Sequence, residues 1–398
     1  MLSERRRLFT LFLLALLVRS LFLFIVGYIH VFPDASLFYE MARGFANLDL
    51  SEYYDVWHGR QFPLYPLILS PLVKFGVGLE SVVWINVLLS SLVAIPAYLL
   101  STNIKNKVFA VLFILLVVLN PTMNYTSTIM AENLFIPLFL FTFYFLDRWY
   151  RSEGLYNKDL IYFFIFFVLT ALTKITGLVF GPLFIVLLIW KFISIRKTKK
   201  SKKAKKVLDP KNKMIIFGVV LFSLIVFASM FMYHRGITIS LNHQLFVNNL
   251  FYLVFGSFML FWFIDWEAIS FMFRPSRKAG LAYVGVLLIV LTFIGVSLLS
   301  SHGRYLEPII PVVLYLGILG WVNDYKGKKV KYTRMILFIL TSLVLLSIYF
   351  YDDVQYFYQS VFLIAILPSA LGRLAGLLYF LPLIFTMMLF INIKLKHL

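Results

Sequence analysis

Long apolar runs recur along nearly the whole chain, and short polar or basic stretches separate them. A helix of about 20 apolar residues crosses the hydrocarbon core of a bilayer, where every backbone polar group must be satisfied internally. The pattern therefore predicts an all-α, polytopic membrane protein with about twelve transmembrane helices, within a range of about 10 to 14. The predicted spans are residues 8–29, 81–100, 107–122, 132–147, 160–174, 176–192, 214–233, 246–264, 280–300, 306–322, 335–350 and 374–393.

The apolar runs leave no room for an independent soluble unit, so we predict a single transmembrane domain over residues 1–398, without a soluble C-terminal domain. Of all residues, 61% are hydrophobic and 14% are charged, whereas soluble domains average about 45–50% and about 25%. Two apolar stretches, 63–75 and 359–372, are too short or too rich in proline to span. The first is expected to form a juxtamembrane helix within an outer loop over residues 30–80.

The net charge of +19 is gathered in short clusters between the apolar runs, which is how topology signals are distributed. The run RKTKKSKKAKK at 196–206, inside a loop over 193–213, is expected to lie on the cytoplasmic side against anionic lipids. Alternation of the spans then places the N-terminus in the cytoplasm of a plasma-membrane protein. Nucleic acid is not an expected partner. The chain has no cysteine, so thiolate chemistry is excluded.

The polar candidates for chemistry fall on the outer side of this topology, and the first of them is Asp34. Pro33 is expected to end the first membrane helix, with Asp34 as the N-cap of a short amphipathic helix whose apolar face includes Phe38 and Met41. One interpretation is that Asp34 only caps this helix. The other is that its carboxylate, held at the membrane boundary, is a general base for an acceptor hydroxyl.

His58 and Arg60 follow in the same loop, ahead of an apolar segment punctuated by prolines. A guanidinium pairs with two phosphate oxygens at once, which makes Arg60 a candidate ligand for a phosphate. The alternative is that Arg60 anchors the loop in the membrane interface beside Tyr54 and Trp57.

Two ionisable residues mark the outer ends of predicted spans. Glu132 opens the fourth span, where capping and the helix dipole account for a carboxylate as well as a catalytic role does. Lys174 lies between Thr173 and Thr176, where two apolar helices meet. An ionisable residue at such a depth is a functional candidate by default.

A further polar cluster, His302, Arg304, Tyr305 and Glu307, lies in one turn between two spans. Snorkelling of the long side chain to the interface explains Arg304 alone, but it does not explain the whole set. The cluster therefore favours anion binding, and Lys174 is a candidate to share the same anion.

The sequence gives little reason to expect a cofactor. His234 and His243 have no carboxylate nearby in sequence, which is weak evidence for a metal, and no Walker, dinucleotide-binding or zincin motif occurs. We therefore predict no metal ligands and disfavour a nucleotide-bound donor.

These residues together resemble the GT-C superfamily of membrane glycosyltransferases, specifically its protein O-mannosyltransferase and aminoarabinose transferase-like branch, which uses polyprenyl-phosphate sugars. The resemblance runs through nearly the whole chain. It rests on the order and spacing of DASLFYEMARGF, FPLYPLILSPLVKFG, AENLFIPLFLF, LTKITG and HGRYLEPIIPVVLYLG. Many relatives have two adjacent acids where this chain has Asp34 and Ala35, which argues against a metal. Many also carry a soluble C-terminal domain, and without one the acceptor stays open.

The resemblance implies transfer of a sugar from a dolichyl or undecaprenyl phosphate to a lipid, glycan or protein acceptor at the outer membrane face. In-line attack of the acceptor hydroxyl on the anomeric carbon would invert the configuration of the sugar. The resemblance also implies Asp34 as the general base and Glu132 as a second acid of the active site. It places Lys174, Arg304 and Tyr305 on the donor phosphate, and His58 and Arg60 among the substrate-binding residues. His302 is a further substrate-binding candidate because it belongs to the same polar cluster as Arg304.

Two other functions also fit cations near a membrane surface. A transporter or flippase of lipid-linked sugars needs polar residues through the bilayer, whereas the candidates here crowd one face. An enzyme of the O-antigen ligase or polymerase type shares the donor chemistry, but it usually needs a large outer loop with Arg and His, and the loop 234–245 is small.

Overall fold

The computed structural model describes residues 2–27, 33–49, 63–119, 126–197, 253, 280–298, 306 and 308–323, and every regular element in these ranges is helical. The predicted spans 214–233, 335–350 and 374–393, the stretch 359–372 and nearly all of 246–264 lie outside them. The helices are α1 (Leu2–Val26), α2 (Pro33–Asn47), α4 (Leu64–Lys74), α5 (Leu79–Ser91), α6 (Ala94–Ser101), α7 (Lys107–Val118), α8 (Glu132–Arg151), α9 (Lys158–Thr173), the 3₁₀ helix η2 (Ile175–Val179), α10 (Phe180–Lys197), α14 (Gly280–Leu298) and α15 (Ile310–Asn323).

Three stretches of the described residues are long and apolar enough to cross a membrane, namely Glu4–Phe24, Leu79–Ser101 and Ile175–Phe192. Along α1, large apolar side chains at Phe9, Leu13, Leu17, Leu21 and Phe24 are exposed, with Phe24 exposed to 80%. Their helical spacing makes one continuous apolar stripe. Exposure of such a stripe to water is unfavourable, whereas contact with lipid is not. The protein is therefore embedded in a membrane through several helices.

The first membrane helix ends earlier than Pro33. α1 stops at Val26, and Gly27 takes a left-handed conformation with φ of 74° while its N–H donates to the Leu23 carbonyl at 2.8 Å. This is the usual C-terminal stop of a helix at glycine. Pro33 instead begins α2, because a proline in the first position of a helix needs no N–H and already has helical φ. The expectation that Asp34 is the N-cap is therefore wrong, since Asp34 lies inside the first turn.

The predicted span 81–100 consists of two helices, α5 and α6, that meet at a turn over Leu92 and Val93. Pro96, at the start of α6, has no N–H to offer the carbonyl one turn earlier, so the helical ladder is interrupted there. The short apolar stretch with internal prolines forms α4, as the sequence predicts.

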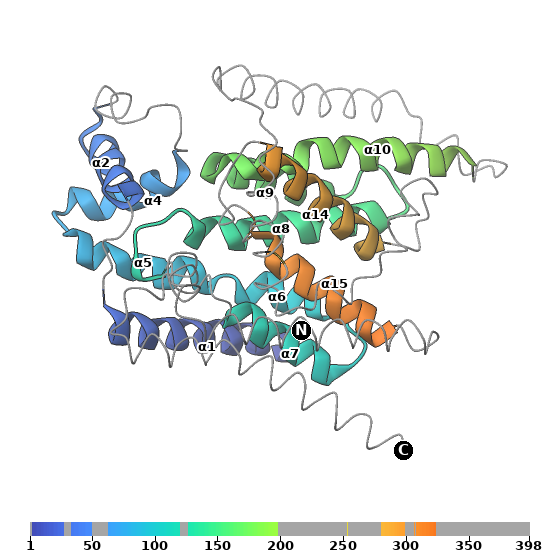
Figure 1. Cartoon of the computed structure of the whole chain (residues 1–398), viewed down its shortest axis with the longest axis horizontal. Coiled ribbons are helices and arrows are strands. Elements are labelled where there is room, and N and C mark those ends of the chain that lie inside the picture. Colours follow the sequence, from blue (N-terminus) through green and yellow to red (C-terminus); the bar gives the residue numbers. More distant parts are fainter. Residues whose placement is uncertain are drawn as a thin grey trace, which may run out of the picture.

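α8 runs through the middle of the described helices (Figure 1), with α5 and α6 packed on one side and α9, α10 and α14 on the other. Phe135, Phe139 and Phe143 recur every fourth residue along it and are fully buried. The Phe139 ring lies 4.7 Å from that of Phe180 at the start of α10. A helix that buries nearly all its faces is the core of the bundle, so its two ends are fixed with respect to all its neighbours.

α2 and α4 pack against each other beside α5 and lie at the left end of the molecule in Figure 1. The Phe38 and Tyr65 rings meet edge to face with their centroids 5.2 Å apart. The Tyr39 hydroxyl donates to the Val77 carbonyl at 3.2 Å. These contacts fasten the helix that carries Asp34 to the membrane bundle.

Candidate functional site

Residues 126–131, the described stretch that leads into α8, lie in the interior of the bundle without α-helical conformation. Residues 126–131 of this connection are all buried, and they include the polar side chains of Thr126, Ser127 and Thr128. Irregular backbone at membrane depth is tolerated only where protein or a polar cavity supplies hydrogen-bond partners. The polar groups around 126–131 supply them here, so we call this stretch the buried connection.

Asn86 of α5 supplies one such partner. Its amide nitrogen donates to the Thr128 carbonyl at 2.7 Å, while its Oδ1 accepts a hydrogen bond from the Tyr65 hydroxyl at 2.7 Å. All three side chains are almost wholly buried. The amide of Asn133 donates to the Met130 carbonyl at 3.1 Å. These hydrogen bonds thus tie helices α4 and α5 to the buried connection, and the groups that form them are buried away from water.

Arg19 supplies the second set of partners from α1. Its guanidinium donates to the Val118 carbonyl and to the Thr126 hydroxyl, each at 3.3 Å, and the side chain is 1% exposed. The Ser90 hydroxyl lies 3.5 Å from that of Thr126. Arg19 and Asn86 are missing from the sequence-based candidates, although a lone arginine inside an apolar span is itself a signal.

Glu132 and Lys174 form a buried ion pair where the buried connection enters α8. Glu132 is the first residue of α8, and Lys174 is the residue after α9, in extended conformation. The Lys174 Nζ donates to Glu132 Oε1, with the lysine side chain 13% exposed and the glutamate side chain 3% exposed. The Nζ also lies 5.9 Å from the centroid of the Phe135 ring. The pair neutralises both charges in a region of low dielectric, which a buried charge requires.

Gly177 explains how the LTKITG turn holds Lys174 in place. The Gly177 N–H donates to the Lys174 carbonyl at 3.0 Å. A Cβ atom at this position would lie 2.8 Å from Cγ2 and 2.9 Å from the carbonyl carbon of Thr170. Only glycine lets η2 approach the end of α9 this closely.

The structure brings together Glu132 and Lys174 among the sequence-based candidates. Asp34 lies in the first turn of α2, and its side chain is not described. His58, Arg60, His302, Arg304 and Tyr305 lie outside the described residues.

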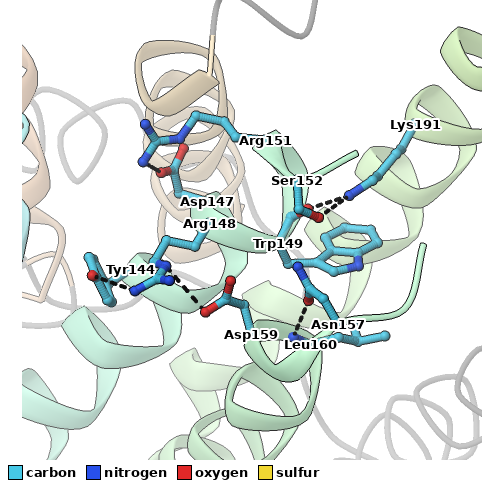
Figure 2. A network of polar contacts seen from close by, with 10 residues as sticks. All are labelled: Tyr144, Asp147, Arg148, Trp149, Arg151, Ser152, Asn157, Asp159, Leu160 and Lys191. Carbon is cyan, nitrogen blue, oxygen red and sulfur yellow. Dashed lines mark hydrogen bonds and ion pairs between the residues drawn. The ribbon is translucent and has the colours of Figure 1, made fainter. Parts of the chain in front are cut away.

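The far end of α8 carries a second polar network (Figure 2). Arg151 pairs with the fully buried carboxylate of Asp147, one turn earlier in α8. The Arg148 Nε lies 3.2 Å from the carboxylate of Asp159 at the start of α9, and another nitrogen of the same guanidinium donates to the Tyr144 hydroxyl at 3.1 Å. These contacts join α8 to α9 at the end opposite to Glu132.

Lys191 of α10 completes the same network (Figure 2). Its Nζ donates to the Trp149 carbonyl and, at 3.0 Å, to the Ser152 hydroxyl, and it lies 4.5 Å from the centroid of the Trp149 ring. The indole nitrogen of Trp149 donates to the Leu155 carbonyl at 2.8 Å. Cations at the C-terminal end of a helix are stabilised by its dipole, so this network is accounted for as a structural clamp.

The sequence matches no protein-family model, and it shows no significant similarity to a characterised protein. The fold does have a known counterpart, the crystal structure of ArnT from Cupriavidus metallidurans bound to undecaprenyl phosphate. The two chains superpose with a TM-score of 0.51 at 14% identity, over 95% of this chain and 72% of ArnT. This similarity supports an all-helical, multi-pass membrane fold like that of ArnT.

Proposed function

We propose that this protein is a glycosyltransferase that moves a sugar from a polyprenyl phosphate to a lipid, glycan or protein acceptor. The observation that carries the proposal is the buried pair of Glu132 and Lys174 at one end of a GT-C-like bundle. ArnT, with which this fold superposes, holds undecaprenyl phosphate in its crystal structure. A lysine at the edge of an apolar bundle suits the head group of such a lipid, whose tail lies between helices.

In this proposal Lys174 binds the donor phosphate. The leaving group of a polyprenyl-phosphate sugar is already ionised, so its departure needs fixed cations rather than a general acid. The Lys174 ammonium is a cation with three N–H donors, and one of them bonds to Glu132. Glu132, proposed from sequence as a second acid of the site, orients the ammonium. Arg304, Tyr305, His302, His58 and Arg60 are the further groups proposed to bind the donor.

Asp34 is the proposed general base. It accepts the proton of the acceptor hydroxyl, the oxygen attacks the anomeric carbon, and the bond from that carbon to the phosphate oxygen breaks. The polyprenyl phosphate leaves with the bonding electrons, and the configuration of the sugar is inverted. α2, which carries Asp34, packs on α4, and we propose that this packing keeps Asp34 at the membrane boundary. The chemistry uses no metal in this proposal.

We place the site on the outer side of the plasma membrane, with the N-terminus in the cytoplasm. The basic run at 196–206 supports this orientation because cytoplasmic loops carry the excess of Lys and Arg. Asp34 follows the first span and Glu132 opens the fourth predicted one, so both fall on the same side.

A transporter of lipid-linked sugars is the second candidate, because Arg19 and Asn86 place polar groups inside the bundle. However, both side chains bond to protein groups that tie helices together, namely the Thr126 hydroxyl and the Thr128 carbonyl. Such contacts fasten a bundle that does not need to open through the membrane. The observation favours the enzyme.

The test is sugar transfer by the full-length protein in liposomes that contain radiolabelled polyprenyl-phosphate sugars and a membrane extract as acceptor. Wild type is compared with Asp34→Asn and with Glu40→Gln, a matched acid on the exposed side of α2. We expect transfer by wild type and Glu40→Gln, also in EDTA, and loss in Asp34→Asn. Transfer by Asp34→Asn would remove the base. Donor flipping without transfer by any variant would favour the transporter.

A further inference from the structure

Arg19 is a charged residue within an otherwise apolar span, and the local sequence does not explain why it is there. It is the only charged residue between Leu8 and Val26, about two turns before the end of α1. Its side chain is 1% exposed and points into the protein rather than along the helix to the membrane surface. A buried arginine is expensive at membrane depth and marks a functional candidate.

The two partners of Arg19 are Val118 and Thr126, which come just before and just after residues 119–125 in the sequence. Val118 is the last residue of α7, and its carbonyl is one of those that a helix cannot satisfy internally. A cation there is also favoured by the helix dipole. Thr126 is the first described residue after the segment. One guanidinium therefore ties both Val118 and Thr126 to α1.

The elements joined by this clamp are the ones that carry the two proposed acids. α1 is followed by α2, whose first turn contains Asp34. Thr126 begins the buried connection, which leads directly into α8 at Glu132. Asn86 and Ser90, one turn apart on α5, contact the same connection at Thr128 and Thr126. Besides the packing of α1 on α5 and α6, Arg19 thus links α1 by hydrogen bonds to the connection that leads to Glu132.

We propose that Arg19 is a positioning residue for sugar transfer, which acts through Val118 and Thr126 to set the base-bearing α2 relative to the Glu132–Lys174 pair. The inference rests on the proposed function. Arg19 touches no substrate in it. Misplacement of a reacting group by about 1 Å can reduce a rate by about a hundredfold, so a distant clamp of this kind acts mainly on kcat.

The kinetic test compares Arg19→Met and Arg19→Lys with wild type in the liposome assay, with Thr10→Val on the exposed side of α1 as the control. We expect Arg19→Met to lower kcat about tenfold to a hundredfold with the donor KM nearly unchanged, because Arg19 does not contact Lys174. Arg19→Lys restores part of kcat, since an ammonium can keep one of the two contacts. In a background of Thr126→Val, Arg19→Met adds less than it does alone.

A second measurement does not depend on activity. Because the chain has no cysteine, spin labels can be placed at Glu40→Cys on α2 and Leu172→Cys on α9, both exposed positions. We expect Arg19→Met to shift or broaden the distance distribution between the labels, and Thr10→Val to leave it unchanged. An unchanged distribution in Arg19→Met, or a kcat equal to that of wild type, overturns the inference.

The two measurements separate this inference from the proposed function. If wild type transfers no sugar but Arg19→Met still changes the distance distribution, the proposed function fails while Arg19 keeps its role in setting α2. If wild type is active and Arg19→Met matches it in both measurements, the proposed function stands and the inference is wrong.

Discussion

Glu132 and Lys174 close one end of the α8–α9 hairpin by a buried ion pair, although 42 positions separate them in the sequence. The other end of the same hairpin is closed by Arg148 and Asp159. The two closures differ in setting, because the first is largely buried while the Arg148 side chain is 48% exposed.

Removal of one member of the buried pair leaves the other charge without its compensation. We expect Glu132→Gln to lower the free energy of unfolding by about 3 kcal/mol, the scale for breaking a buried ion pair. The double variant Glu132→Gln with Lys174→Met is expected to recover part of this loss. Unfolding in mixed detergent micelles measures both. A double variant as unstable as the sum of the singles would mean that the two side chains do not interact.

Lys174→Met tests the proposed phosphate contact. A hydrogen bond to a charged group contributes about 1.5–3 kcal/mol, so the donor KM is expected to rise about tenfold to a hundredfold. Lys191→Met is the matched control, because it makes the same change at the other end of α8, where Lys191 bonds to the Trp149 carbonyl. Lys191→Met is expected to lower stability and to leave the donor KM unchanged. Equal effects of both variants on KM would contradict a specific role of Lys174.

Gly177→Ala tests the turn that carries Lys174. The added Cβ would meet the Thr170 backbone at 2.9 Å, so η2 must move away from α9. We expect a loss of about 1–3 kcal/mol of stability, as for other overpacked sites, together with a raised donor KM. Gly154→Ala is the control, since its Cβ would meet its nearest neighbour at an ordinary 3.5 Å.

Asn86→Leu tests the fastening of the buried connection. The substitution removes the donor to the Thr128 carbonyl and the acceptor for the Tyr65 hydroxyl. Each buried polar group left without a partner costs about 1–3 kcal/mol, so the loss of stability is expected to be about 2 kcal/mol or more. Thermal unfolding in detergent measures it. A stability equal to that of Ser70→Ala, on the neighbouring α4, would show that these contacts do not fasten the connection.

The proposed orientation can be tested with thiol reagents because the chain has no cysteine of its own. Leu48→Cys, at a position exposed to 86%, is expected to react with a membrane-impermeant maleimide added outside intact cells. Ser201→Cys, inside the basic run, is expected to react only after the membrane is made permeable. The reverse pattern would place the site in the cytoplasm.

Much of the fold can be predicted from the sequence because apolar runs of spanning length are strong signals of transmembrane helices. The short helix α4 and the amphipathic helix α2 both follow from local pattern. The end of α1 does not, since both Gly27 and Pro33 can stop a helix and only the structure shows that Gly27 does so. The turn between α5 and α6 is hidden for a similar reason, because the residues on both sides of it are apolar.

The candidate site can be predicted from the sequence only in part. Glu132 and Lys174 stand out individually as ionisable residues at span ends, but no local pattern links residues on different helices. Arg19 and Asn86 are single polar residues within apolar runs, so a window average conceals them. Their importance depends on what faces them, and the irregular buried connection between α7 and α8 is a tertiary feature that hydropathy does not register.

The ion pair also bears on which anions can reach Lys174. A free phosphate in water would approach an ammonium whose charge is already balanced by the carboxylate of Glu132, so its electrostatic attraction to Lys174 is weak. A phosphate tethered to a long hydrocarbon is itself concentrated in the plane of the membrane, and it arrives along the apolar flank of the helices. If Lys174 binds the donor phosphate as we propose, Glu132 thus disfavours soluble phosphates and sugar nucleotides relative to donors that are anchored in the membrane.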